Sequence, residues 1–304
     1  MEEIKEIKSV TIVPFTLMNS AISAILGLIY ALILILVLGL VAIFVPTTAS
    51  GIIGLLLTSA LAVILILPTG SFLMSIVFSF LLSYIYNLLV PRVGGIKLKL
   101  HDMKEIQSIP VIPLSLMASI IYTIYTFILM LIVAPILMLA LQGATFAAIS
   151  TTSSLPELGG LGALGIIGII IMVIAIPIMV FIYTFIYSAL MALLYNFLAP
   201  KIGGIRLKFK SIQNNLFEIK KIKPIPLALI LAVATTVATT ILNLIFYIPE
   251  MLMYLAVREP LFAIGYLIGN ILGTFILVFI IYAITALIYN FLRPTIGGIE
   301  LELE

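Results

Sequence analysis

The feature that most constrains this sequence is a long stretch without any formal charge. No Asp, Glu, Lys or Arg occurs from Pro14 to Pro91. About 20 consecutive apolar residues are enough for a helix to cross the roughly 30 Å hydrocarbon layer of a bilayer. The stretch therefore has room for two membrane-spanning helices and the turn between them, and we predict an integral membrane protein.

The composition of the whole chain agrees with this prediction. The chain has 304 residues, of which 64% are hydrophobic and 9% charged, whereas a soluble domain carries about 25% charged residues. A chain this poor in charge cannot cover a water-exposed surface of its own size. The sequence contains no cysteine, which excludes disulfides and thiolate metal sites. Its net charge of +3 is too small to indicate a nucleic-acid partner.

One motif occurs three times along the chain. The pattern Tyr-Asn-x-Leu-x-Pro-x-x-Gly-Gly-Ile begins at Tyr86, Tyr195 and Tyr289, and an alternating apolar and charged tail follows each copy. A shorter element precedes each pair of apolar segments, and its copies are Lys5–Pro14, Lys104–Pro113 and, more weakly, Phe217–Pro226. Because repeats decide the fold of a chain, we predict three tandem units, 1–103, 104–216 and 217–304, each with a strand, two spans and a second strand.

The predicted fold class is a mainly α integral membrane protein with six transmembrane helices. The helices form three tandem hairpins, and short β-strands form a small cytoplasmic sheet. The expected spans are 15–45, 58–90, 114–141, 161–199, 227–248 and 261–292. Of the 15 basic residues, only Arg258 falls in a predicted helix-to-helix turn, whereas three acidic residues, Glu157, Glu250 and Glu259, lie in such turns. Because basic residues stay in the cytoplasm, we expect a multi-pass protein of the cell membrane with both termini cytoplasmic.

The repeated motif has a structural interpretation. A proline four residues after the Asn removes one helical N–H donor, so we predict that the helices end at these prolines and that the Asn amide binds local backbone groups. The paired glycines then permit positive φ angles for a sharp exit. This role is assigned to Asn87, Pro91, Gly94, Gly95, Asn196, Pro200, Gly203, Gly204, Asn290, Pro294, Gly297 and Gly298. Binding of an anion by the Gly-Gly turns is the alternative.

The strands are predicted from two patterns. The alternating tails, such as 96–100, have the period of a strand with one buried face. The short apolar runs 10–13 and 109–112 are interpreted as strands that continue into helices through Pro14 and Pro113, since proline is favoured in the first helical turn. Strands with unpaired edges are unfavourable, so we expect the six strands to pair within units and between them.

These features together show a resemblance to a known family. A strand, a proline, two spans, the Tyr-Asn…Gly-Gly-Ile motif and an alternating tail resemble a family of small actinobacterial membrane proteins of unknown function. Members end in a Leu-Tyr-Asn…Val-Gly-Gly-Ile-Glu-Val-Thr-Leu type of motif, to which 300–303 is similar. The family usually has one unit per chain, and proline here replaces an acidic or polar position after the Asn. The resemblance implies the architecture of each unit and no known activity.

The sequence shows no catalytic or metal-binding constellation. His101, the single histidine, stands beside Asp102 in a joining segment, where a solvated loop is the interpretation. We therefore expect a protein that is not an enzyme and has no cofactor and no metal. The first hypothesis is a membrane scaffold or accessory subunit that contacts the bilayer and a membrane-protein partner or a second copy. The alternatives are a pseudo-three-fold channel or small-solute transporter, and a lipid-binding membrane protein.

Three sets of residues bear on these hypotheses. Small and polar residues in the spans pack helices or line a neutral pore, and they are Asn19, Ser20, Ser23, Thr123, Thr126, Thr184, Asn243, Asn270 and the Thr-rich run 234–240. The double GxxxG of Gly265, Gly269 and Gly273 is a helix-packing or partner face. The basic residues Arg92, Lys201 and Arg293 at the cytoplasmic boundary are candidate ligands of lipid headgroups.

Overall fold

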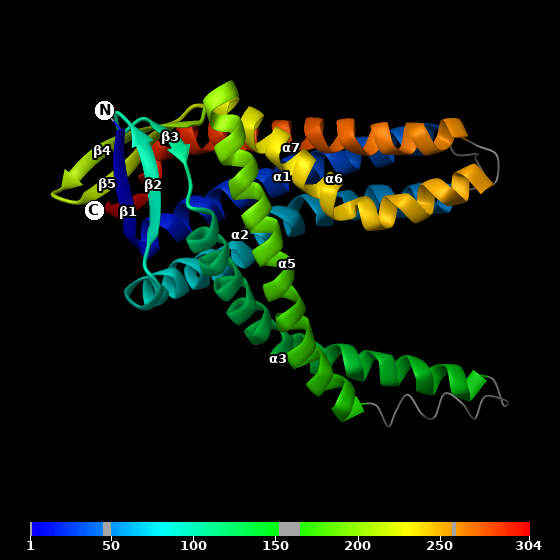
Figure 1. Ribbon diagram of the computed structural model, residues 1–304. Helices are drawn as coiled ribbons and strands as arrows, with labels where there is room; N and C mark the ends of the chain where they lie inside the picture. The colour runs from blue at the N-terminus through cyan, green and yellow to red at the C-terminus, as the bar shows by residue number, and fades with distance from the viewer. Residues whose placement is uncertain (1, 45–49, 152–164, 257–259) are drawn as a thin grey trace. The chain divides into compact units, whose positions relative to one another are not determined.

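The computed structural model describes residues 2–44, 50–151, 165–256 and 260–304 (Figure 1). Within these ranges, six helices are long and apolar enough to cross a membrane, as the uncharged stretches predict. The chain also forms a small antiparallel sheet, as predicted. The predicted turn residues Glu157, Arg258 and Glu259 lie outside the described ranges.

Three successive segments of the chain have the same order of described elements. The first contains β1 (Glu2–Val10), α1 (Ile12–Phe44), α2 (Ser50–Val93) and β2 (Ile96–His101). The second contains β3 (Glu105–Ser108), α3 (Val111–Thr151), α5 (Gly165–Ile202) and β4 (Ile205–Gln213). The third contains β5 (Leu216–Ile222), α6 (Pro224–Ala256), α7 (Pro260–Ile296) and β6 (Glu300–Leu303). Each expected span overlaps one of the six helices.

The six strands form a closed antiparallel barrel in which the order in space follows the order in the chain. β1 pairs with β2 from Glu2↔His101 to Ile7↔Ile96. β1 also pairs with β6, with Val10 opposite Leu301, and this pairing closes the barrel and brings the two ends of the chain together (Figure 1). Pairing within and between the predicted units is confirmed, whereas closure into a barrel was not predicted.

Apolar side chains on the strands of the barrel are buried. Along β2, Leu98 and Leu100 pack in an apolar cluster with Ile106 and with residues of α5 and α6, while Lys97 is exposed. Leu100 is 0% exposed, and Leu303 at the end of β6 is 1% exposed. The alternation that predicted a strand with one buried face therefore corresponds to one side facing the barrel core.

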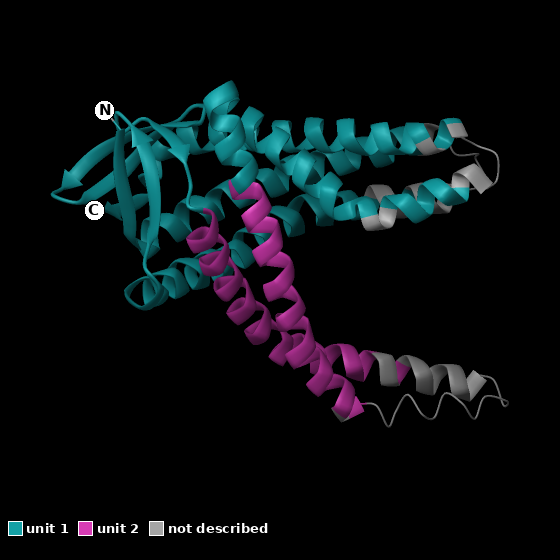
Figure 2. Cartoon of the chain, in the orientation of Figure 1, with its two compact units in different colours: residues 1–110, 193–304 teal, residues 111–192 magenta. Residues whose placement is uncertain are grey.

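The chain divides into two compact units (Figure 2). Unit 1 comprises residues 1–110 and 193–304, which include the barrel, α1, α2, α6, α7 and the last turns of α5. Inside unit 1, α1 packs against α2 and α7, and α6 packs against α7. Unit 2 comprises 111–192, with α3 and most of α5, where Gly168 lies against Met138.

The prediction that helices end at the prolines of the motif is wrong. α2 continues past Pro91 to Val93, and α5 and α7 likewise continue for two residues past their prolines. Proline removes one N–H, but its fixed φ angle is compatible with the helix. The helix ends at Gly94, whose φ is +89° and whose N–H binds the carbonyl oxygen of Val90 at 2.9 Å. This is the αL type of C-cap, for which glycine is favoured because it has no Cβ.

The predicted strands at 10–13 and 109–112 are also misplaced. β1 ends at Val10 and α1 begins at Ile12, while β3 ends at Ser108 and α3 begins at Val111. The last two residues of each apolar run thus begin a helix, with the following proline at the third helical position. Val13 is 73% and Ile112 68% exposed, which fits side chains that face lipid and not the barrel core. Branched apolar residues are common to strands and to lipid-facing helices, so composition alone could not separate the two.

The second glycine of each pair is required for close packing of the helix exit on the barrel. A methyl group on Gly204 would overlap the carbonyl oxygen of Ile106 and lie 3.0 Å from Oη of Tyr195. We predict that Gly204→Ala lowers the free energy of unfolding by about 1–3 kcal/mol, the usual effect of overpacking. Thermal unfolding in detergent micelles measures this change.

Gly70→Ala in α2 is the matched control, since its Cβ would meet nothing within 4 Å. This control should leave stability unchanged or raise it by up to about 1 kcal/mol, because alanine is the better helix former. Equal stability of the two variants would contradict the tight contact at Gly204.

Candidate functional site

A tyrosine hydroxyl bridges two strands at each place where the barrel meets a helix pair. Oη of Tyr86 in α2 donates to the carbonyl oxygen of Ile7 on β1 at 2.8 Å and accepts from the N–H of Ile96 on β2 at 3.3 Å. Ile7 and Ile96 form the last pair of the β1–β2 ladder, so the hydroxyl continues the ladder where direct pairing ends. The same two bonds join Tyr195 to Ile106 and Ile205, and Tyr289 to Ile219 and Ile299, at 2.5–3.0 Å.

The asparagine after each tyrosine binds the end of a strand. Asn87 accepts from the N–H of Val10 through Oδ1 and donates to the Val10 carbonyl oxygen through Nδ2, both at 2.8 Å. Val10 is the last residue of β1, so the amide satisfies both backbone groups where the strand ends and the helix has not begun. Asn196 binds Ile109 and Asn290 binds Ile222 in the same way, at 2.7–2.9 Å.

The expectation that these amides bind local backbone groups is wrong. Their partners are 77, 87 and 68 residues earlier in the chain. The reason is geometrical: the helix returns from the other end of its hairpin to the strand that began the segment, and the Asn lies on the face that contacts this strand. The motif therefore joins the two ends of a helix hairpin and does not only end a helix.

A carboxylate, which the sequence-based predictions did not include, completes each junction. Oε1 of Glu6 accepts from the N–H of Gly95 at 2.8 Å. Glu105 accepts from Gly204 at 2.7 Å and Glu218 from Gly298 at 2.8 Å. A signal was present, because Glu-Ile stands at the same place in all three upstream elements. Each backbone N–H exposed by the sharp glycine turn thus has a charged acceptor.

Each of these carboxylates has a basic partner, and the three partners come from different places in the fold. Glu6 lies 3.3 Å from Nζ of Lys8 on its own strand. Glu105 accepts from Nε of Arg206 on the facing strand β4 at 3.1 Å. The third carboxylate, Glu218, accepts two bonds, at 2.8 and 2.6 Å, from the guanidinium of Arg293 on α7.

The third ion pair is the most enclosed of these. Glu218 is only 8% exposed, and the side chain of Arg293 is 20% exposed. The Arg293 guanidinium, together with the N–H of Gly298, holds the pKa of Glu218 below its ordinary value, although burial acts in the opposite direction. At the first junction, the N–H of Gly95 is the main cause of a lowered pKa for Glu6.

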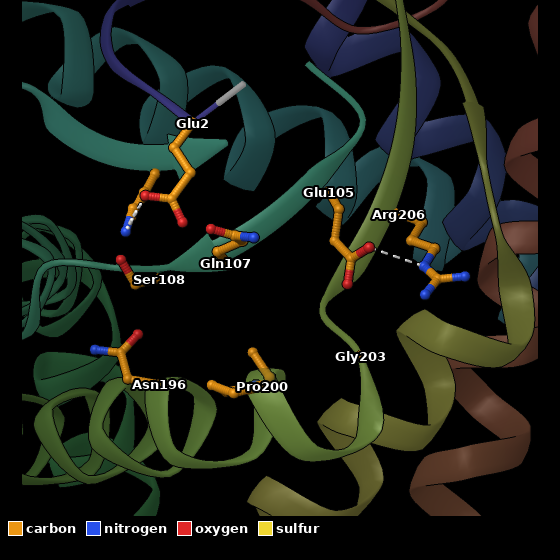
Figure 3. Close-up of a pocket in the computed structure, with 10 residues that line it drawn as sticks. Glu2, Glu105, Gln107, Ser108, Asn196, Pro200, Gly203 and Arg206 are labelled. Atoms are coloured by element: carbon orange, nitrogen blue, oxygen red, sulfur yellow. Dashed lines mark hydrogen bonds and ion pairs between the residues drawn. The ribbon is translucent and has the colours of Figure 1, made fainter. Parts of the chain in front are cut away.

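A cavity of about 600 Å³ lies beside the second junction (Figure 3). Two ion pairs are in its wall: Glu2 with Lys99 at 2.6 Å, and Glu105 with Arg206 at 3.1 Å. Because the opposite charges balance, the cavity does not select for an anion or a cation. The remaining residues in its wall are Gln107, Ser108, Asn196, Ala199, Pro200 and Gly203.

Gln107 and Ser108 distinguish this cavity from the first junction. At the corresponding positions of β1, Lys8 forms ion pairs and Ser9 donates to Glu302 at 2.8 Å. The side chains of Gln107 and Ser108 have no hydrogen-bond partner among the residues that the structure describes. They are the neutral polar groups that the wall offers to a ligand or to water.

The candidate lipid ligands of the sequence analysis lie at the ends of three different helices. Arg293 binds Glu218 with both bonds described above. Nζ of Lys201 lies 3.4 Å from the centre of the Phe197 ring in the last turns of α5. Arg92 is exposed in the last turn of α2. A headgroup at Arg293 would therefore compete with a buried carboxylate.

The glycines of the double GxxxG do not pack against the other described residues of unit 1. A Cβ on Gly265, Gly269 or Gly273 of α7 would meet nothing within 4 Å. At the start of the same helix, a hollow of about 430 Å³ is lined by Leu261, Phe262, Gly265 and Tyr266. The glycine face of α7 is therefore open along its described length.

Hydroxyl groups within the spans mostly bind their own helices. Ser20 is fully buried and donates to the carbonyl oxygen of Thr16 at 2.7 Å. Thr239 binds the Thr235 carbonyl in the same way at 2.8 Å. Ser23 donates to Ser75 at 3.0 Å and so links α1 with α2. Only the Ser23–Ser75 bond is a contact between packed helices, whereas the other two satisfy a hydroxyl within its own helix.

The barrel has buried apolar side chains on its strands and where its strands meet the helix ends. Leu100 and Leu303 are buried in its interior, and Ile106 and Ile219 belong to apolar clusters that join the strands to the helix ends. The described ranges also contain no group of three or more His, Asp or Glu side chains that could hold a metal ion. The recurring polar residues are occupied in joining backbone segments.

The matched carboxylates allow a test of the third ion pair. Glu218→Gln keeps an oxygen that can accept from Gly298, but it removes the charge opposite Arg293. We predict a loss of about 2–3 kcal/mol in the free energy of unfolding, the value for hydrogen bonds to charged groups. Glu105→Gln should cost about 1 kcal/mol or less, because Arg206 is 45% exposed. Thermal unfolding of both variants in the same detergent tests the difference, and equal losses would contradict it.

The lowered pKa of Glu218 predicts an acid dependence of stability. A carboxyl group whose pKa is lower in the folded state stabilises the fold fully above its unfolded pKa, and this contribution is lost as the pH falls through the folded pKa. The unfolding temperature of the wild type should therefore fall below about pH 4.5, the ordinary pKa of the group. Glu218→Gln should show a smaller decrease between pH 6 and pH 3, and an unchanged pH profile would exclude this carboxylate as its source.

Comparison with known proteins gave no relative. A scan against protein-family models and searches of the curated proteins and of the solved structures found no match to this chain. The resemblance to the actinobacterial family therefore stays a prediction, and the interpretation of the three junctions depends on their geometry.

Proposed function

We propose that this chain is a non-enzymatic integral membrane scaffold or accessory subunit that binds a partner through its helices. In this proposal the chain consists of three tandem strand–helix–helix–strand units, 1–103, 104–216 and 217–304. The barrel and both termini lie on the cytoplasmic side of the cell membrane. The six long apolar helices support the multi-pass arrangement, and the basic residues concentrated on the barrel side support the orientation.

The open glycine face of α7 is the observation that carries this proposal. Glycines spaced four residues apart allow the backbones of two helices to approach closely in a membrane. Gly265, Gly269 and Gly273 have this spacing and have no neighbour within 4 Å of an added Cβ. Unit 1 thus has a close-packing surface that its other described helices do not use. A helix of another membrane protein, or of a second copy, fits this surface.

The polar residues that recur support the same function. The tyrosine, asparagine and glutamate of each junction bind backbone groups of the chain itself, as described above, and so they are not available to a substrate. Leu100 and Leu303 on the barrel strands are apolar and buried. These features fit a protein whose role is to hold a stable shape in the membrane and to present its surface to a partner.

The size of complexes purified from native membranes tests the proposal. In a mild detergent, the wild type should form a stoichiometric complex with a second membrane protein or a second copy, measured by size-exclusion chromatography with light scattering. Gly269→Leu fills the open face and should reduce the complex about tenfold, which corresponds to a loss of roughly 1–2 kcal/mol of helix packing.

Gly39→Leu on α1 is the control, because Gly39 also has open space around it and is not part of the GxxxG pattern. This variant should keep the complex. A wild-type protein that is a lone monomer and conducts ions in liposomes would replace the scaffold with the channel hypothesis.

A further inference from the structure

The hairpin of β4 and β5 carries a group of exposed lysines. Lys208 of β4, Lys220 and Lys221 of β5, and Lys223 directly after β5 are all exposed. None of these four has an ion-pair partner within the described part of the chain. In contrast, Arg206 on the same hairpin is paired with Glu105 at 3.1 Å. We name these four residues the hairpin lysines.

The register of the hairpin places like charges directly opposite each other. Lys208 is the cross-strand partner of Lys221, and the register then shifts, so that Phe209 pairs with Ile219. The shift leaves Lys220 outside the ladder as an additional exposed residue. Like charges directly opposite each other destabilise a sheet. The fold alone gives no reason for this arrangement, whereas an anionic ligand would remove the repulsion.

The hairpin lysines lie at the start of a membrane-spanning helix. The N–H of Lys223 binds the carbonyl oxygen of Arg206 at 3.0 Å, and α6 begins at the next residue, Pro224. The candidate span also begins at Pro224, and Ile225 is 67% exposed, as expected for a side chain in contact with lipid. At about 3.3 Å per residue, Lys221 is only about 10 Å from this start.

We infer that the hairpin lysines bind the anionic headgroups of lipids in the leaflet next to the barrel. Basic residues beside a membrane-spanning helix attract anionic lipids, and the attraction falls off within a Debye length, which is about 8 Å at physiological ionic strength. Lys208, Lys221 and Lys223 are within reach of the headgroup layer at this distance, since a lysine can extend its apolar stem along the boundary. A soluble acidic partner would need to enter this same layer.

These residues differ from the basic residues at the ends of α2, α5 and α7. Arg293 is paired with the buried Glu218, and Lys201 lies over Phe197. The hairpin lysines have no such partner within the described residues, so an anionic headgroup can bind them without breaking a contact of the fold. The inference does not depend on a protein partner for α7.

The lipid composition around the full-length protein tests this inference. The protein is reconstituted in nanodiscs of equal parts phosphatidylcholine and phosphatidylglycerol, then extracted in mild detergent, and the retained lipids are measured by mass spectrometry. The wild type should retain more phosphatidylglycerol than phosphatidylcholine. In the variant K208Q/K221Q/K223Q, the ratio of retained phosphatidylglycerol to phosphatidylcholine should be at least tenfold lower than in the wild type. The reason is that each lysine near a membrane surface contributes roughly a fivefold preference for anionic lipid. The preference of the wild type should also decrease at high salt.

The control variant K5Q/K99Q/K104Q removes three lysine charges at positions six or seven residues from the nearest membrane-spanning helix, and it should keep the preference. Equal losses in both variants would show a general charge effect and overturn the inference, as would an unchanged preference in the hairpin variant.

Binding of a short polyglutamate peptide or of a DNA oligonucleotide is measured in parallel. If the hairpin variant loses only such binding and keeps its lipids, the surface serves a soluble partner and the lipid assignment is wrong. Unfolding temperatures confirm that both variants are folded, and that of the hairpin variant should be unchanged or higher because the Lys208–Lys221 repulsion is removed.

Discussion

The structure depends on how a membrane helix is converted into a strand of the barrel. At such a point, the last helical carbonyls and the end of the strand ladder both lack regular backbone partners. Each junction solves this problem with three side chains, a tyrosine that bridges two strands, an asparagine that pairs with a strand end and a glutamate that accepts from a glycine N–H. Without these bonds, unpaired backbone groups would lie between the hydrocarbon layer and the barrel core, where each is costly.

The junctions also explain why the barrel closes. Every helix hairpin is bonded at both of its ends to neighbouring strands, so three hairpins supply six strands in the order of the chain. An open sheet of these strands would leave two edges, one at β1 and one at β6, and exposed edges favour association with other chains. Pairing of β1 with β6 removes both edges. In every junction the glutamate accepts from the glycine N–H. Its basic partner lies on a strand in two junctions and on a helix in the third.

The six long apolar helices and the pairing of the strands could be predicted from the sequence, because uncharged stretches and alternating patterns depend on local physics. The predicted helix ends are wrong, because proline is known as a helix breaker and Pro91 is therefore predicted as the end of the helix. The helix ends instead at Gly94, which has a positive φ angle. Barrel closure and the partners of Asn87 could not be predicted from local patterns, because both depend on contacts between distant residues. The role of Glu6 could have been inferred from the recurrence of Glu-Ile, since a carboxylate kept beside a barrel core needs a fixed donor.

The third alternating tail differs from the other two in the sign of its charges, and the closing seam gives the reason. The tails after the first two motifs carry Lys or Arg, whereas the third carries Glu. On the closed barrel, Glu302 accepts from Ser9 at 2.8 Å and Glu304 lies 3.6 Å from Lys8. A basic third tail would place like charges against Lys8 on β1. The acidic tail therefore favours closure by pairing of β6 with β1. It disfavours an arrangement in which β6 takes the place of β2 or β4, whose tails are basic.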